Sequence, residues 1–216
     1  MAAVERIFSR YLVVEDIYPG IAERFLAHGV TRFAEIGGGR GPVSAILRAQ
    51  GVDAFVVDKD PTMVAECAAP AIEGDLRALP LPDESVDGVA AINCLYFLDD
   101  PLVGIREAYR ILKPGGLFVA SSPSRWNDTE LEGINPEWGA PSTFDSEDSP
   151  ALVAAVFGDD IEVDEWHLVA FRLPTSDAIA DYLHAFNVPD WESKAGVITP
   201  PMTITKRGAE VWALKR

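Results

Sequence analysis

The chain is poor in cysteine, histidine and basic residues, and each shortage argues against a class of protein. Its 216 residues include 2 cysteines, 3 histidines and 18 Lys and Arg against 34 Asp and Glu, a formal net charge of −16. Proteins that bind nucleic acids or anionic membranes use clustered basic residues to contact phosphate, so we expect neither kind of partner for this chain. Cys67 and Cys94 lack CxxC spacing, and we expect buried thiols of a reducing compartment rather than a disulfide.

Long hydrophobic runs are also missing. No apolar run approaches the roughly 18 residues that a membrane-spanning helix needs, and the segment Met1–Arg6 does not begin a signal peptide. We therefore expect a cytoplasmic protein. The histidines, at positions 28, 167 and 184, show no metal-ligand spacing, so we expect no metal site. A hydrophobic content of 48% suits one domain over residues 1–216.

Strand-length and helix-length segments alternate along the chain, which predicts an α/β fold with a parallel sheet. The predicted strands are 32–36, 54–57, 86–93 and 117–120, and the predicted helices are 42–50, 61–68 and 102–112. A polar loop, 121–149, is followed by a helix at 151–157, a strand at 161–172, a helix at 175–186 and a last strand at 202–214. We expect Lys113–Gly116 to end one helix and Lys206–Gly208 to interrupt the last strand.

A glycine-rich turn joins the first predicted strand to the next helix. Glycine at 37, 39 and 41 allows positive φ angles and lets a ligand approach where a Cβ would obstruct it. Pro42 suits the first helical position, whose amide has no intrahelical partner. This pattern predicts a nucleotide-cofactor site.

Two acidic positions extend this prediction. Asp58 ends the second strand 17 residues after Gly41, where its two oxygens match the two hydroxyls of a ribose. The alternative is an exposed acid that caps the next turn. Asp75, in Gly74-Asp75-Leu76, is placed to accept from an exocyclic amine while Leu76 packs on a base, although this tripeptide alone is an ordinary turn.

Five motifs in order resemble class I S-adenosylmethionine-dependent methyltransferases, in particular the type 11 group. They are Glu35–Gly41, Asp58, Gly74–Leu76, Leu79–Asp87 and Leu112–Gly116, and the resemblance spans residues 30–120. It implies a Rossmann-like class I methyltransferase fold. In this fold a seven-stranded, mostly parallel sheet has an antiparallel last strand and helices on both faces.

The resemblance also implies S-adenosyl-L-methionine as cofactor, S-adenosylhomocysteine as product and a small-molecule methyl acceptor. Residues 1–30 would form an N-terminal helical segment, 31–121 the cofactor-binding half and 122–216 the substrate-side half. The implied cofactor-binding residues are Glu35, Gly37, Gly39, Gly41, Asp58, Lys59, Asp75, Leu76 and Asn93. In-line displacement depends mainly on alignment, so these acids are expected to bind rather than catalyse.

The acceptor side is less defined. Many family members carry a histidine after the fourth strand, whereas this chain has Asn93-Cys94-Leu95-Tyr96-Phe97-Leu98. Candidate bases are Tyr96, His167 and His184, each of which has an ordinary structural role as the alternative. Candidate substrate contacts are Tyr96, Tyr18 and the loop residues Arg125, Trp126 and Trp138, where the alternative is a loop anchored by its tryptophans.

Two rival functions stay open. A protein that binds S-adenosylmethionine without catalysis, or regulates a partner, would keep the cofactor site and lose the acceptor site. An NAD-dependent oxidoreductase would also use a glycine turn and Asp58, but the third glycine of a G-x-G-x-x-G frame begun at Gly37 falls on Pro42. The pair Tyr109 and Lys113 resembles a dehydrogenase motif, yet lies at a predicted helix end. We expect a monomer or a homodimer.

Overall fold

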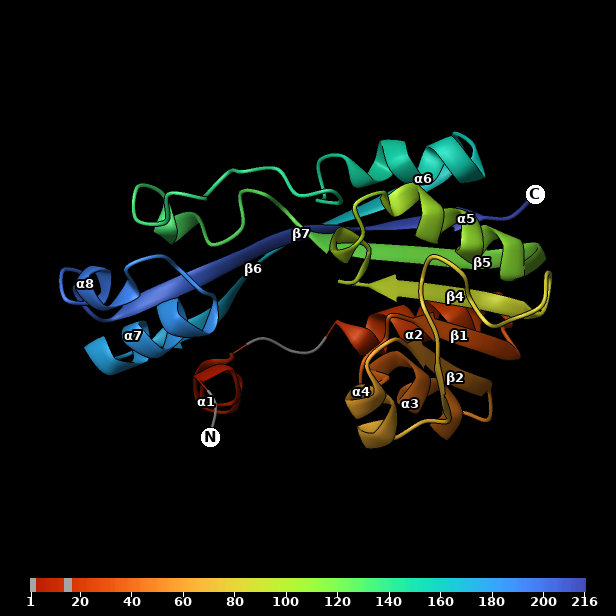
Figure 1. The fold of residues 1–216 in the computed structure, drawn as a ribbon, viewed down its shortest axis with the longest axis horizontal. Helices are drawn as coiled ribbons and strands as arrows, with labels where there is room; N and C mark the ends of the chain where they lie inside the picture. The colour runs from red at the N-terminus through yellow and green to blue at the C-terminus, as the bar shows by residue number, and fades with distance from the viewer. Residues whose placement is uncertain (1–2, 14–16) are drawn as a thin grey trace. The chain divides into compact units, whose positions relative to one another are not determined.

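A computed structural model describes residues 3–13 and 17–216. Its centre is a seven-stranded sheet with the order β3-β2-β1-β4-β5-β7-β6 (Figure 1). The strands are β1 (Arg32–Ile36), β2 (Asp53–Asp58), β3 (Ala71–Glu73), β4 (Val86–Ile92), β5 (Leu112–Pro123), β6 (Ile161–Leu173) and β7 (Met202–Leu214). The predicted fold class is confirmed.

Helices connect these strands. They are α1 (Ala3–Tyr11), α2 (Tyr18–His28), α3 (Pro42–Ala49), α4 (Pro61–Glu66), α5 (Pro101–Ile111), α6 (Ser149–Phe157), α7 (Ser176–Ala185) and α8 (Trp191–Ala195), with 3-10 turns η1 (Leu95–Phe97) and η2 (Thr129–Leu131). Their starts follow from the sequence. Asp60 and Asp100 cap α4 and α5 by accepting from Thr62 N and Leu102 N, and a proline follows each cap.

Pairing within the sheet explains why the carboxyl ends of its first strands meet at one edge. β1 pairs in parallel with β2 and β4, β2 with β3, and β4 with β5. The last strand, β7, is antiparallel to its neighbour β5. The hydrogen bonds between them show this, since Gly115 N donates to Lys215 O and Lys215 N donates to Gly116 O. Polar residues that follow β1, β2, β3 and β4 are thereby gathered in one region.

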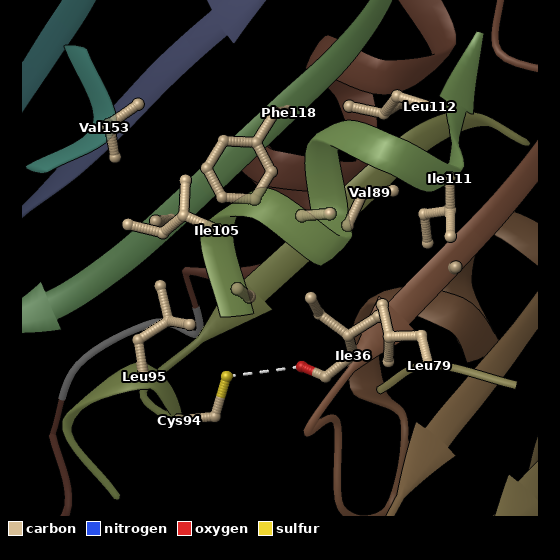
Figure 2. Packing of buried hydrophobic residues seen from close by; sticks show 14 of the residues in the cluster. Ile36, Leu79, Val89, Cys94, Leu95, Ile105, Ile111, Leu112, Phe118 and Val153 are labelled. Carbon is tan, nitrogen blue, oxygen red and sulfur yellow. Dashed lines mark hydrogen bonds between the residues drawn. The ribbon is translucent and has the colours of Figure 1, made fainter. Parts of the chain in front are cut away.

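Two hydrophobic clusters cover the two faces of the sheet. Alternation places Ala34 and Ile36 of β1 on the face covered by α5 and α6, and Phe33 on the face covered by α2 and α3. On the first face, Phe118 stacks on Phe157 with ring centroids 4.8 Å apart. Figure 2 shows this cluster continuing from Phe118 to Cys94, at the end of the sheet where the glycine turn begins.

The chain divides into two compact units. The larger unit contains the described residues of 16–123, together with 141–165 and 209–216. The smaller unit contains the described residues of 1–15, with 124–140 and 166–208. It has its own core, in which Phe171, Tyr182 and Ile204 are fully or almost fully buried. The single domain over 1–216, with its three segments, stays a prediction.

Two predictions about element ends have different outcomes. The helix end before Lys113–Gly116 is confirmed, because α5 ends at Ile111, although β5 begins already at Leu112, which pairs with Val86 of β4. The predicted interruption of the last strand at Lys206–Gly208 is wrong. Both backbone groups of Arg207 are hydrogen-bonded, since its oxygen accepts from Ser124 N and its N–H donates to Asn127 Oδ1. Partners distant in the chain therefore overrode the local glycine and proline signals.

The N-terminal region contains α1 and α2. The N-terminal helical segment predicted over 1–30 includes residues 1–2 and 14–16, which lie outside the described residues. Within 3–13 and 17–216, no helix has the length and apolar character needed to cross a bilayer.

Candidate functional site

The glycine turn between β1 and α3 has the backbone conformation that its sequence predicts. Gly37, Gly39 and Gly41 have φ angles of 59°, 54° and 69°. A Cβ on Gly37 would lie 2.7 Å from Cys94 Cβ, and a Cβ on Gly41 would lie 2.5 Å from Val56 Cγ2. Gly39 differs, because a Cβ there would meet nothing within 4 Å. Two glycines therefore permit close packing, and the third borders open space.

Glu35 holds the start of α3. Alternation in β1 directs its side chain to the α3 face, where it is 1% exposed and accepts from Ser44 N at 2.7 Å and Val43 N at 3.4 Å. Gly41 cannot cap this helix with a side chain, so the Glu35 carboxylate satisfies two of its free amides. Burial raises the pKa of Glu35 to about 7, although these hydrogen bonds oppose the shift.

Asp58, at the end of β2, contacts the same turn. Its Oδ2 accepts from Gly39 N at 2.8 Å and its Oδ1 accepts from Asp60 N at 2.9 Å. Each carboxylate oxygen can accept more than one hydrogen bond. Asp58 therefore fixes the glycine turn and keeps acceptor capacity for a ligand.

A cavity of about 560 Å³ opens beside Asp58 and the glycine turn. This volume is in the range of small-molecule sites, roughly 300–1,000 Å³. Its lining residues come from the ends of β1, β2 and β3, from the segment after β4, and from α4 and α5. They are Gly37, Asp58, Lys59, Asp60, Met63, Gly74, Asp75, Leu76, Arg77, Cys94, Phe97, Leu98, Asp99, Asp100 and Val103. The structure thus brings together Gly37, Asp58, Lys59, Asp75 and Leu76 of the predicted cofactor residues.

Asp75 is paired with a residue that sequence reasoning did not single out. Arg77 donates to it from the backbone N–H at 2.8 Å, from Nε at 2.9 Å and from Nη2 at 2.6 Å. These bonds hold the pKa of Asp75 at about 2. The Asp75 carboxyl is consequently ionised at neutral pH and can only accept hydrogen bonds, which is what a contact to an exocyclic amine requires.

A second cavity, of about 410 Å³, borders the other side of the turn. Its lining residues are Tyr18, Glu35, Gly38, Arg40, Pro42, Ile92 and Asn93. Asn93 follows β4 with a φ of 52°, and its N–H donates to Ser121 O at 2.9 Å. This second cavity therefore brings together Glu35, Asn93 and Tyr18, the last of which is a predicted substrate contact. Asp75 and Leu76 line the first cavity instead.

None of the three candidate bases is among the residues that line the two cavities at the glycine turn. Burial raises the pKa of Tyr96 to about 12, so its hydroxyl keeps its proton at neutral pH. His167 is exposed on β6, and His184 of α7 stacks on Trp191 with ring centroids 4.7 Å apart. Among the described residues, the linings of the two cavities at the glycine turn contain no histidine.

The loop residues proposed for substrate contact form a defined structure within the smaller unit. Trp126 and Trp138 meet edge to face with ring centroids 4.9 Å apart, and Trp138 Nε1 donates to Asn127 O at 2.9 Å. Trp138 is the anchored member of the pair. Trp126 is 42% exposed, and Arg125 precedes it.

Sequence reasoning missed Cys94 and Phe97 as cavity residues. Cys94 is 4% exposed, and its Sγ lies 3.3 Å from Ile36 O, the contact drawn in Figure 2. Burial raises the pKa of its thiol, which stays neutral. Phe97 is 70% exposed although it is aromatic. Its position after the fourth strand is the one available signal, and only the fold shows that this position lines the cavity.

Residues 34–120 match a family described as a methyltransferase domain. They include the last three residues of β1, all of β2, β3 and β4, most of β5 and the whole glycine turn. This part of the chain is similar to S-adenosylmethionine-dependent methyltransferase domains. The matched range agrees with the extent of the resemblance found in the sequence.

Curated relatives of this chain include a protein of Mycolicibacterium smegmatis named probable S-adenosylmethionine-dependent methyltransferase. It is 33% identical over 116 residues, which are 51% of this chain and 44% of the relative. The chloroplastic 2-methyl-6-phytyl-1,4-hydroquinone methyltransferase of Arabidopsis thaliana is 30% identical over 109 residues, 45% of this chain and 32% of that protein. The chain therefore covers less than half the length of these relatives.

A solved structure extends the likeness beyond residues 34–120. The crystal structure of the cyclase SpnF superimposes with a TM-score of 0.65 at 20% identity, over 92% of this chain and 80% of that one. This likeness concerns the fold alone.

Alanine at two of the glycines separates packing from backbone strain. Gly37→Ala adds a contact with Cys94 to an unfavourable φ and should lower the free energy of unfolding by about 2–5 kcal/mol. Gly39→Ala adds only the φ cost and should lower it by about 1–2 kcal/mol. Denaturant unfolding of both variants tests this order, and equal losses would contradict it.

Glu35 predicts a pH-dependent contribution to stability. Between pH 4.5, its ordinary pKa, and about 7, the folded protein keeps the Glu35 proton that the unfolded chain has lost. Stability relative to Glu35→Gln should therefore fall as pH rises through this window, by about 3 kcal/mol in total, and stay level above it. Denaturant titrations of both proteins at several pH values measure the difference. A difference that does not vary with pH would disprove the shift.

Proposed function

We propose that the protein is an enzyme that transfers a methyl group from S-adenosylmethionine to a small-molecule acceptor. The observation that carries the proposal is the cavity beside the glycine turn, where Asp58, Asp75 and Leu76 occur together at the carboxyl ends of β2 and β3. Its size suits a nucleoside, and its acidic residues suit a ligand that carries a positive sulfonium. The hydroquinone methyltransferase among the relatives supports a small-molecule acceptor.

The residues present fit the cofactor. Asp58 would accept from the ribose hydroxyls with the capacity that its two backbone contacts leave free. Asp75 would accept from the adenine amine while Leu76 contacts the ring, with Lys59 at the same wall. Gly37, Gly39 and Gly41 would let the backbone approach the ligand, and Glu35 and Asn93 would border its amino-acid end at the second cavity.

The bound cofactor supplies an electrophilic methyl group, and the acceptor attacks it in line. The contribution of the chain is to hold both reactants in alignment and to exclude water. Tyr96 keeps its proton at neutral pH, so it serves as a hydrogen-bond donor rather than as a base. We propose Tyr18, Tyr96, Arg125, Trp126 and Trp138 as acceptor contacts. The cytoplasmic location and the monomeric or homodimeric state stay predictions from the sequence.

Calorimetric titration with S-adenosylmethionine, S-adenosylhomocysteine and NADH tests the cofactor. Both adenosyl ligands should bind and NADH should give no signal, because Pro42 replaces the third glycine of the dinucleotide-binding pattern G-x-G-x-x-G. Binding of NADH alone would reverse the assignment in favour of an oxidoreductase. If the adenosyl ligands bind, transfer of a labelled methyl group to a panel of acceptors distinguishes an enzyme from a non-catalytic binding protein.

Asp58 provides the sharpest test at residue level. Asp58→Ala should weaken S-adenosylmethionine binding by about 1–3 kcal/mol, since ribose hydroxyls would lose their acceptors. Asp58→Asn keeps one acceptor oxygen and should give a smaller loss. Asp53→Ala is the matched control, because Asp53 is exposed at the opposite end of the same strand. Unchanged affinity in Asp58→Ala would disprove this role.

A further inference from the structure

The smaller unit contains a buried lysine that the proposed methyl transfer does not use. Lys206 lies in β7, and its Nζ is 2.6 Å from Oδ1 of Asp128, with both side chains 15% exposed. Removing an ammonium from water is costly unless a partner charge and further contacts compensate. Burial lowers the pKa of Lys206, while Asp128 and Glu130 oppose this shift.

Three aromatic rings surround the same ammonium. The Nζ of Lys206 lies 4.2 Å from the ring centroid of Phe186, 5.3 Å from that of Tyr182 and 5.8 Å from that of Phe171. These distances are within the range of about 6 Å at which a ring face attracts a cation. The lysine is therefore held by one carboxylate and by rings from β6, from α7 and from the residue that follows α7.

The carboxylate belongs to a segment with a strained backbone. Asp128 has φ 57° and ψ 54°, a left-handed conformation that a non-glycine residue adopts at a cost. Hydrogen bonds fasten the segment to β7 on both sides of Lys206. Asp128 N donates to Thr205 O at 3.0 Å, and Ser124 N donates to Arg207 O at 2.8 Å.

We propose that Lys206 is a positioning residue that fixes segment 124–131, and with it the Trp126 side chain, by acting through Asp128. Trp126 N donates to Ser124 Oγ at 2.9 Å, and a Cβ on Gly139 would lie 2.4 Å from the Trp126 ring. The indole thus depends closely on the backbone path of its segment. The consequence for acceptor binding rests on the proposed function, whereas the positioning itself does not.

Hydrogen exchange in three variants of the full chain tests the proposal. Lys206→Met keeps the length of the side chain and removes its charge. Asp128→Asn together with Lys206→Met removes both charges and leaves no unpaired one. Lys194→Met is the matched control, because Lys194 belongs to the same unit and its ammonium donates to the Pro189 carbonyl instead of to segment 124–131.

We expect Lys206→Met to accelerate exchange of the 124–131 amides by about tenfold or more, while the amides of α7 exchange as in the wild type. The double variant should recover the melting temperature, because no buried charge is left unpaired, yet keep the fast exchange. Lys194→Met should change neither. Unchanged exchange in Lys206→Met would overturn the proposal, as would equal acceleration throughout α7.

Recovery of slow exchange in the double variant would also overturn it, since Lys206 would then only neutralise Asp128. Titration of the wild-type protein and the same variants with S-adenosylmethionine distinguishes a failure of the positioning role of Lys206 from a failure of the proposed function. Failure of the wild-type protein to bind this ligand would count against the proposed function and leave the exchange result intact.

Discussion

The contact between the Glu35 carboxylate and the first free amides of α3 is the interaction on which the proposed cofactor site depends. A glycine turn has no side chains with which to hold itself, and Gly41 offers the helix no cap. Glu35, near the end of β1, holds the turn and also caps the helix, because its carboxylate accepts from Val43 N and Ser44 N. Its burial is unfavourable for the ionised form, and the amide hydrogen bonds at the start of α3 offset part of that cost.

Close to this contact, residues of the hydrophobic core also line the proposed cofactor site. Ile36, whose side chain packs in the cluster of Figure 2, presents its carbonyl oxygen to Cys94, and Cys94 in turn occupies the space that a side chain at position 37 would need. The same cysteine lines the cavity proposed for the cofactor. Close packing under the sheet edge therefore fixes the shape of the ligand-facing surface above it.

The sequence predicts the cofactor half well because its signals are local. The range 32–36 is identical to β1, the positive φ angles at Gly37, Gly39 and Gly41 follow from glycine itself, and the start of α3 follows from Pro42. The sequence predictions fail where hydrogen-bond partners that are distant in the chain determine the secondary structure. Leu112 joins β5 because Val86 is available to it, and Arg207 stays in β7 because Ser124 and Asn127 satisfy its backbone. The pair of Asp75 and Arg77 is a local contact, between residues two apart, that sequence reasoning overlooked. No local pattern reveals that Lys206 is enclosed by aromatic rings, since those contacts need the tertiary structure.

The two backbone contacts of Asp58 have a consequence for ligand choice. Because Gly39 N–H and Asp60 N–H each use one direction of approach, the remaining lone pairs point in fixed directions before any ligand arrives. In the role proposed for Asp58, a ribose with two free hydroxyls would meet acceptors that the turn already holds in place. A nucleoside with a phosphate on either hydroxyl would bring negative charge against a carboxylate that has no donor to offer, and would be repelled. The proposed role therefore implies selection of an unmodified ribose as well as its binding.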